Sequence, residues 1–209
     1  MHNILVAGAH GNIGKKIIKL LDDSQYFTPI AMVRKQEYFD AFKSQNINAV
    51  LADVTENTSH AFENVDKVIF AAGSGGKAVV EVDQEGAKNL IKEAEKQGIK
   101  KFVMLSSLGA DNPEEADELK DYLKAKHNAD EFLKQSNLSY TIVRPGTLND
   151  NLGNDKIELK KKLNKHGEIS RDDVAQTLVR CLHDDAPKNT TFEIISGDTL
   201  IGNALSNIE

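Results

Sequence analysis

The 209-residue chain has only one cysteine, Cys181, and this scarcity excludes several kinds of site. A single cysteine can form no intramolecular disulfide, no cysteine-based zinc site and no redox-active cysteine pair. Cys181 lies near Val174, Leu178 and Leu182 in a late helical pattern. We therefore expect it to pack in the core, and we expect no metal site.

Long apolar runs and an excess of positive charge are also missing. No segment reaches the length of a membrane span, and the chain starts with a strand pattern in place of a signal peptide. We therefore expect a cytoplasmic protein with no membrane partner. The net charge of −6 argues against non-specific binding of nucleic acid. The basic run Lys160–Lys165 is most simply a solvated face.

The composition is that of an ordinary globular protein, with 40% hydrophobic and 28% charged residues. We expect one domain over residues 1–209, in which a short C-terminal segment, about 147–209, lies on the substrate side. There is no internal repeat, low-complexity segment or interdomain linker.

Apolar strand patterns alternate with helical patterns along the chain, and several strand runs are apolar throughout, as a sheet covered on both faces requires. The predicted strands are Ile4–Ala7, Thr28–Val33, Ala49–Leu51, Lys67–Ala71, Lys101–Leu105, Tyr140–Val143 and Thr191–Ile195. The predicted helices are 12–22, 36–44, 56–63, 84–97, 114–135 and 171–183, with Ser170 as the N-cap of the last. This order predicts an α/β fold of the Rossmann type: a doubly wound parallel sheet of about seven strands with helices on both faces.

The segment Asn3–Ile18, NILVAGAHGNIGKKII, joins the first strand to the first helix through Gly8, Gly11 and Gly14. A turn with so few side chains leaves the helix N-terminus open, and its unpaired N–H groups and dipole attract a phosphate. The context of a strand before and an amphipathic helix after favours a dinucleotide site over a merely tight turn. We expect His10, Asn12 and Ile13 of the turn to contribute to it.

The end of the second strand carries Arg34 and no adjacent carboxylate. A carboxylate there would suit the ribose hydroxyl of NAD, whereas arginine suits the 2′-phosphate of NADP, so we expect NADP(H) in preference to NAD(H). Asp53, followed by Val54, could accept a hydrogen bond from an adenine amino group or could instead cap a helix. After the fourth strand, the small residues Ala71, Ala72 and Gly73 would let a dinucleotide approach the backbone.

Taken together, the motifs GAHGNIG, VR, ADV, AAG, VDQEG, MLSS, YLKAK and TIVRPG, followed by ISRDDVA and SGD, extend over nearly the whole chain. In this order they resemble an atypical short-chain dehydrogenase/reductase of the small NAD(P)-binding type. The chain is also similar to NmrA-like proteins, to biliverdin/flavin reductase-like proteins and to NAD-dependent epimerases/dehydratases. The resemblance implies the fold and a nicotinamide nucleotide, and it says much less about a substrate.

Tyr122 and Lys126 stand one helical turn apart and share an inward-facing arc with Asp130. An inward lysine needs a partner, and a lysine–aspartate pair there could be purely structural. The resemblance implies that Tyr122 donates a proton to a substrate carbonyl while Lys126 stabilises the phenolate and holds the nicotinamide ribose. It further implies that Ser107, or else Ser106, donates a hydrogen bond to that carbonyl. If Ser107 does so, we expect Ser106 to contact the cofactor.

Two more positions follow from the resemblance. Asp83, in VDQEG, stands where an asparagine is common, and it could equally be a helix N-cap. Pro145 would lie against the nicotinamide, although the sequence RPG alone is a plain turn. The short segment after Gly146 predicts an open site for a small carbonyl, quinone or flavin acceptor.

Three functions remain open. The first is an NADP-dependent oxidoreductase, and the second is an NADP-sensing regulator without turnover, like NmrA-type proteins. A nucleotide-sugar epimerase or dehydratase is disfavoured, because relatives with that activity build a larger substrate domain. The sequence leaves open a homodimer or a protein partner.

Overall fold

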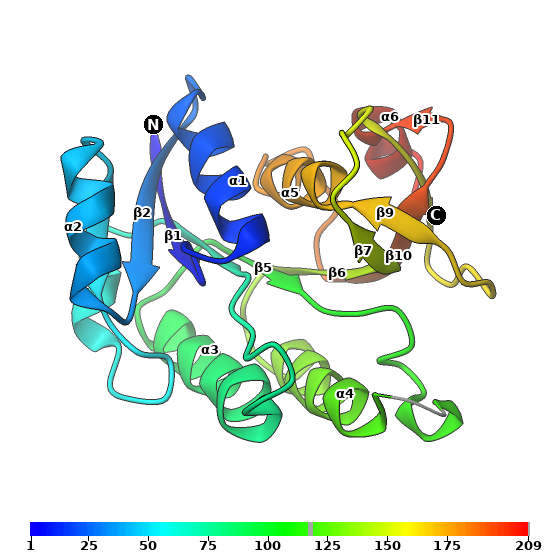
Figure 1. Ribbon diagram of the computed structural model, residues 1–209, viewed down its shortest axis with the longest axis horizontal. Coiled ribbons are helices and arrows are strands. Elements are labelled where there is room, and N and C mark those ends of the chain that lie inside the picture. Colours follow the sequence, from blue (N-terminus) through cyan, green and yellow to red (C-terminus); the bar gives the residue numbers. More distant parts are fainter. Residues whose placement is uncertain (117–118, 209) are drawn as a thin grey trace.

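The strands of the protein pair into one large sheet that separates two layers of helices (Figure 1). The structure, a computed structural model, describes residues 1–116 and 119–208. Seven strands run parallel in the order β3-β2-β1-β4-β5-β6-β10. Beyond β10 the strands β8 and β11 follow, each antiparallel to its neighbour. The sheet consists of β1 (His2–Ala7), β2 (Phe27–Val33), β3 (Asn48–Leu51), β4 (Lys67–Phe70), β5 (Lys101–Leu105), β6 (Tyr140–Pro145), β8 (Lys156–Lys160), β10 (Thr190–Ser196) and β11 (Thr199–Leu200).

All seven strands predicted from the sequence are present, and they are the seven parallel ones. The predicted number is nevertheless too low, because β8 and β11 bring the sheet to nine strands. A separate two-stranded parallel sheet pairs β7 (Thr147–Asn149) with β9 (Glu168–Ser170). These additional strands all come from the segment after Pro145. The Rossmann-type architecture is confirmed.

The helices match their predicted positions where the apolar pattern is strong. The structure contains α1 (Asn12–Asp22), α2 (Gln36–Ser44), α3 (Ala87–Lys96), α4 (Lys120–Lys134), α5 (Arg171–Arg180) and α6 (Ile201–Ser206), together with the short helical segments η1 (Ser59–Phe62), η2 (Val79–Gly86) and η3 (Pro113–Glu115). None of the helices in the described part of the chain has the length and apolar content that crossing a bilayer requires.

Three helix predictions need correction. The helix expected at 56–63 is only the single 3₁₀ turn η1. The one expected at 84–97 is α3, which begins at Ala87, and residues 84–86 belong to a π-helical segment, η2. The helix expected at 114–135 divides into η3 and α4, and residues 117–118 between them lie outside the described residues. The short helix α6 was missed.

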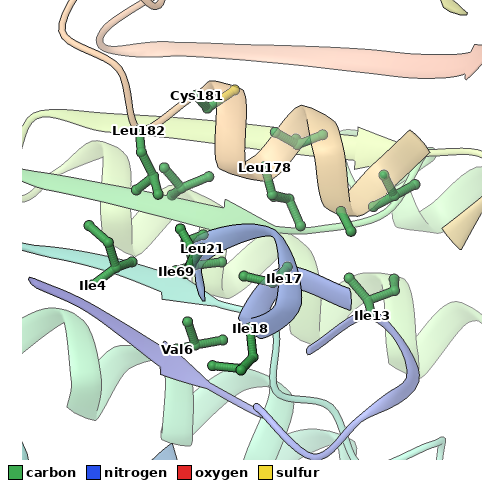
Figure 2. Packing of buried hydrophobic residues seen from close by; sticks show 14 of the residues in the cluster. Ile4, Val6, Ile13, Ile17, Ile18, Leu21, Ile69, Leu178, Cys181 and Leu182 are labelled. Carbon is green, nitrogen blue, oxygen red and sulfur yellow. The ribbon is translucent and has the colours of Figure 1, made fainter. Parts of the chain in front are cut away.

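Alternate residues of the central strands pack against opposite helix layers, as a sheet covered on both faces requires. Ile4 and Val6 of β1 face α1, α2, α5 and α6, whereas Leu5 and Ala7 face α3 and α4. Figure 2 shows Ile17 of α1 near Leu178 of α5. Cys181, which ends α5, is fully buried in this layer, which confirms its expected core position, and burial raises the pKa of its thiol to about 12.

Candidate functional site

The candidate site lies at the carboxyl ends of β1 and β4, which are neighbours in the sheet. After β1 the chain continues into α1 on one face, and after β4 it continues into η2 and α3 on the other. Because the two connections diverge, the strand order reverses here and a crevice opens between them. In doubly wound sheets this is the position where ligands bind.

The glycine turn at this position is closely packed against the segment that follows β4. Gly8 has a φ of +84°, and a Cβ added to it would lie 2.6 Å from the backbone of Ala72. A Cβ on Gly14 would collide with the carbonyl oxygen of Gly8, which also accepts a hydrogen bond from Gly11 N (2.9 Å). Because Gly8 and Gly14 have no side chains, the backbone at the end of β1 can pack directly against the start of α1 and against the segment that follows β4.

The N-terminus of α1 is suited to an anion. Its N-cap is Gly11, no side chain caps it, and its first turn contains no acidic residue. The side chain of Ile13 is 7% exposed and packs into the core, so this residue can offer a ligand only its backbone N–H. The same holds for Gly14, whereas Asn12 has a side chain as well. The N–H groups and the helix dipole supply the attraction.

A cavity of about 410 Å³ opens beside this turn. Nine of the fifteen predicted cofactor-binding residues line it: Gly8, His10, Gly11, Arg34, Asp53, Val54, Ala71, Ala72 and Gly73. The remaining six predicted residues, Asn12, Ile13, Gly14, Ser106, Lys126 and Pro145, do not line it. The structure thus brings together residues from the ends of β1, β2, β3 and β4, as the predicted dinucleotide site requires.

The charges around the cavity are mostly positive. Arg34, Lys35 and Lys77 line it, against the single carboxylate of Asp53. The ammonium of Lys35 is 3.2 Å from Glu37, whereas Arg34 takes part in no ion pair with the residues that the structure describes. Asp53 Oδ1 accepts hydrogen bonds from the backbone N–H and the hydroxyl of Thr55, both 2.9 Å, and so stabilises a turn. The alternative that Asp53 caps a helix is wrong, because the next helical segment, η1, begins only at Ser59.

An aromatic stack joins the glycine turn to α2 at one wall of the cavity. The rings of His10 and Tyr38 are stacked, with 3.3 Å between their centroids, and Lys35 Nζ lies 5.4 Å from the Tyr38 centroid. Burial lowers the pKa of His10, and the positive charge of Lys15 lowers it further. Both effects favour the neutral form of the stacked imidazole.

Sequence reasoning missed four polar or aromatic residues of this cavity: Lys35, Tyr38, Ser74 and Lys77. Lys35 follows Arg34 directly, and Ser74 and Lys77 belong to GSGGK, a second glycine-rich stretch immediately after a buried strand. That stretch was the available signal. Tyr38 had none, because its contact with His10 depends on how α2 packs beside the turn.

The predicted reaction residues gather on α4 and η2. Lys126 Nζ lies 3.2 Å from Asp83 Oδ1, and the two side chains are 4% and 1% exposed. Asp83 Oδ2 also accepts hydrogen bonds from the N–H (3.0 Å) and the hydroxyl (2.8 Å) of Ser74. Asp83 lies inside η2, so the alternative that it is a helix N-cap is wrong. Lys126 pairs with Asp83 and not with Asp130 of its own helix.

Tyr122 and Ser107 complete the set of predicted reaction residues. The Lys126 ammonium is 5.6 Å from the centroid of the Tyr122 ring, and both residues come from the same face of α4. Ser107 is half-buried, and among the described residues its hydroxyl contacts only the Leu108 carbonyl, at a long 3.4 Å. The hydroxyl of Ser107 thus remains available to a ligand.

Ser106 has a different environment. Its buried hydroxyl donates to Asp130 Oδ2 (2.8 Å), which also accepts from Arg144 Nε (3.0 Å). Arg144 Nη2 lies 2.9 Å from the same oxygen without the alignment of a hydrogen bond. Burial raises the pKa of Asp130, although Arg144 and the Ser106 hydrogen bond oppose it. The Ser106 hydroxyl is therefore held inside the protein by Asp130.

The segment after Pro145 is anchored to the start of α5. Pro145 is buried, and its carbonyl accepts from Leu108 N, which holds the loop that follows Ser107. Ser170 caps α5 by accepting from Asp173 N (3.0 Å), as predicted. Asp173 in turn accepts from the backbone of Asp155 (2.8 Å). The backbone around Asp155 is thus fixed to the start of α5 by Asp173 of the ISRDDVA motif.

Comparisons with known proteins agree with this architecture. A family model described as NAD(P)H-binding matches residues 8–185. The uncharacterised sugar epimerase YhfK of Bacillus subtilis is 39% identical, covering 98% of this chain and 99% of its own.

Two solved structures are similar over most of their length. A Bacillus halodurans protein provisionally assigned as an NAD-dependent epimerase/dehydratase is 35% identical, with a TM-score of 0.93, covering 98% of this chain and 99% of its own. The oxidoreductase ylbE of Lactococcus lactis is 32% identical, with a TM-score of 0.87, covering 97% of this chain and 94% of its own. On the strength of the family match, the relatives and the cavity at the strand ends, this chain belongs to the NAD(P)H-binding family of Rossmann-fold proteins.

Proposed function

We propose that this protein is an NADP(H)-dependent oxidoreductase that transfers hydride to a small carbonyl, quinone or flavin acceptor. The observation that carries the cofactor preference is Arg34, which lines the cavity just after β2, where no carboxylate is adjacent. The planar guanidinium can bind a phosphate through two hydrogen bonds. An NAD-specific site would instead present a carboxylate to the ribose hydroxyl.

The cavity fits the rest of the cofactor. A Cβ at Gly8 or Gly14 would collide with the backbone, so these glycines let the turn close beside the uncapped start of α1, where the diphosphate would bind. Ala71 and Ala72, which are half-exposed and line the cavity, have side chains small enough for a dinucleotide to approach the backbone closely. Lys126 and Pro145 do not line this cavity, and in this proposal the nicotinamide would extend to them.

A reduced nicotinamide, when bound, supplies the hydride. The hydroxyl of Tyr122 would donate a proton to the acceptor oxygen as negative charge develops there, and Ser107 would donate a hydrogen bond to the same oxygen. Lys126, held by Asp83, keeps a donor for the nicotinamide ribose, because an ammonium has three N–H groups. The short segment after Pro145 leaves this side open to a small acceptor.

The cofactor preference is tested by calorimetry with NADPH and NADH on wild type and on Arg34→Ala. We expect NADPH to bind at least tenfold more tightly than NADH, and Arg34→Ala to remove most of that difference while leaving NADH affinity within about twofold. Equal affinities of the wild type for the two nucleotides would contradict the proposal. Lys35→Ala is the matched control, because its ammonium already pairs with Glu37.

Turnover is tested by following NADPH oxidation with a panel of quinones, flavins, aldehydes and ketones. Tyr122→Phe should lower kcat by about 10²-fold or more with an unchanged Kd for NADPH. Equal rates would remove Tyr122 from the mechanism.

A second function, NADP sensing without turnover, is favoured by one observation. The positive charge of Lys126 is already compensated by the buried carboxylate of Asp83. A catalytic lysine without such a partner would keep its full charge for the cofactor and the substrate. NADPH binding without oxidation by any acceptor of the panel would support this function. Sugar epimerisation, which the name of YhfK suggests for that relative, is the third candidate and would require NADP to be reduced and reoxidised within one turnover.

A further inference from the structure

The loop that follows β4 forms a wall of the nucleotide cavity and carries a cation there. Its residues Gly73, Ser74, Lys77 and Ala78 line the cavity together with Gly8 and Gly11 of the glycine turn. In Figure 1 the segment between β4 and α3 passes below α1 toward the start of α3. From the cavity lining and this placement we propose that Lys77 is a cofactor-binding residue that contacts the diphosphate, an inference that rests on the proposed nucleotide function.

The base of the loop is fixed at both ends. Ala72 packs against the backbone of Gly8, and Ser74 is held through its N–H and its hydroxyl by the buried carboxylate of Asp83. At the far end, Ala78 accepts a hydrogen bond from Val82 N (2.9 Å) at the start of η2. Lys77 therefore leaves the backbone from a loop whose ends cannot move far from the glycine turn.

The tip of the loop has freedom to adjust. Gly75 and Gly76 have φ values of +63° and +84°, and a Cβ on either would meet nothing within 4 Å. These glycines are thus required by backbone conformation and not by packing. Because the tip is unpacked and its ends are fixed, the adjacent Lys77 side chain can close over a ligand in the cavity without disturbing the sheet.

Of the cationic side chains that line the cavity, Lys77 is the one that remains to bind the diphosphate. The glycine turn offers N–H groups but no cationic side chain, and Arg34 is at the end of β2, where the ribose phosphate would lie. Lys35 is compensated by Glu37. Within residues 1–116 and 119–208, Lys77 is exposed and belongs to no ion pair, so its ammonium is available to an anionic ligand.

Calorimetry with three nucleotides separates the diphosphate from the ribose phosphate. NADPH has both groups, ADP-ribose has only the diphosphate, and 2′-AMP has only the ribose phosphate. We expect Lys77→Gln to weaken NADPH and ADP-ribose by about tenfold and to leave 2′-AMP within about twofold. Lys77→Arg should restore most of the affinity. Lys43→Gln is the control and should have little effect, because Lys43 is exposed and does not line the cavity. Thermal unfolding of each variant confirms that these surface changes leave the fold intact.

The outcomes distinguish this inference from the proposed function. If wild type binds neither NADPH nor ADP-ribose, the proposed nucleotide function itself is overturned. If wild type binds both and Lys77→Gln binds them equally well, only the role of Lys77 is overturned. Loss of 2′-AMP affinity with retention of ADP-ribose affinity would place Lys77 at the ribose phosphate and would also overturn it.

Discussion

Lys126 and Asp83 form an ion pair inside the protein, with 3.2 Å between Nζ and Oδ1. The pair joins α4, which carries Tyr122, to η2, whose Asp83 also holds Ser74 of the nucleotide loop. Removing one member of a buried pair leaves an uncompensated charge, which is costlier than removing both. This relationship makes the stability of the site measurable without knowledge of its substrate.

Asp83→Asn should lower the free energy of unfolding by about 3 kcal/mol, because the ammonium of Lys126 stays buried without its counter-charge. Urea unfolding measures the loss. In the double variant with Lys126→Met, most of the stability should return, since neither charge remains. Additive losses in the double variant would show that the two side chains stabilise the fold independently.

Lys101, at the amino end of the central strand β5, makes a pH-dependent contribution to stability. Burial lowers the pKa of Lys101 from 10.5 to about 8. Its ammonium donates to the Pro187 carbonyl (2.7 Å), and Cys181, Lys188, Lys67 and Asp184 are the ionisable groups around it. The unfolded chain binds this proton more tightly than the folded chain, so the cost of charging Lys101 is full below pH 8 and disappears as the pH rises to 10.5.

The stability of Lys101→Met relative to wild type should therefore fall by roughly 1–3 kcal/mol between pH 7.5 and 10.5. Chemical unfolding at several pH values measures this difference. Lys67→Met is the matched control, because Lys67 is in register with Lys101 on β4 and its ammonium lies 2.7 Å from Asp184. A flat difference for Lys101→Met would show that its amine is not perturbed by burial.

Gly14→Ala should destabilise the protein by about 2–4 kcal/mol, because the new Cβ would collide with the Gly8 carbonyl and push α1 away from the turn. Gly202→Ala is the control, since a Cβ there meets nothing within 4 Å. It should be neutral or slightly stabilising, as alanine favours a helix. Thermal unfolding compares the two, and equal midpoints would contradict the close packing of the turn.

Ser170→Ala should cost about 1 kcal/mol, because the N-cap hydroxyl that accepts from Asp173 N is lost. Ser206→Ala is a suitable control, since the exposed Ser206 hydroxyl only donates to a carbonyl within α6. Urea unfolding should separate the two variants. A smaller loss for Ser170→Ala than for Ser206→Ala would mean that Asp173 holds the start of α5 by itself.

The parallel sheet was predictable from the sequence because each of its strands is a short apolar run bounded by turns. The glycine turn was predictable for the same reason, since strand, turn and helix are contiguous in the sequence. In contrast, β8 is Lys156–Lys160, KIELK, in which polar residues outnumber apolar ones and only Ile157 is fully buried. Its strand conformation depends on pairing with β10, which no local pattern reveals.

The partner of Lys126 illustrates the same limit within the site. Helical spacing places Asp130 one turn from Lys126, and this local relationship suggested a pair. In the structure Asp130 accepts hydrogen bonds from Ser106 and Arg144. Lys126 instead pairs with Asp83, which lies in a segment distant in the sequence. Spacing along a helix shows which residues share a face, but the competition between partners from other elements decides which of them pair.

The π-helical form of η2 sets the angle at which Asp83 leaves the backbone. A π-helix has one more residue in each hydrogen-bonded turn than an α-helix. If one residue were deleted between Asp83 and Ala87, the segment could continue as a regular α-helix into α3, and the residues before the deletion, Asp83 among them, would rotate by roughly 100°. Asp83 would then point away from Lys126, while every strand kept its place. A single-residue deletion could thus uncouple the nucleotide loop from α4, so segment length is as strict a requirement here as residue identity.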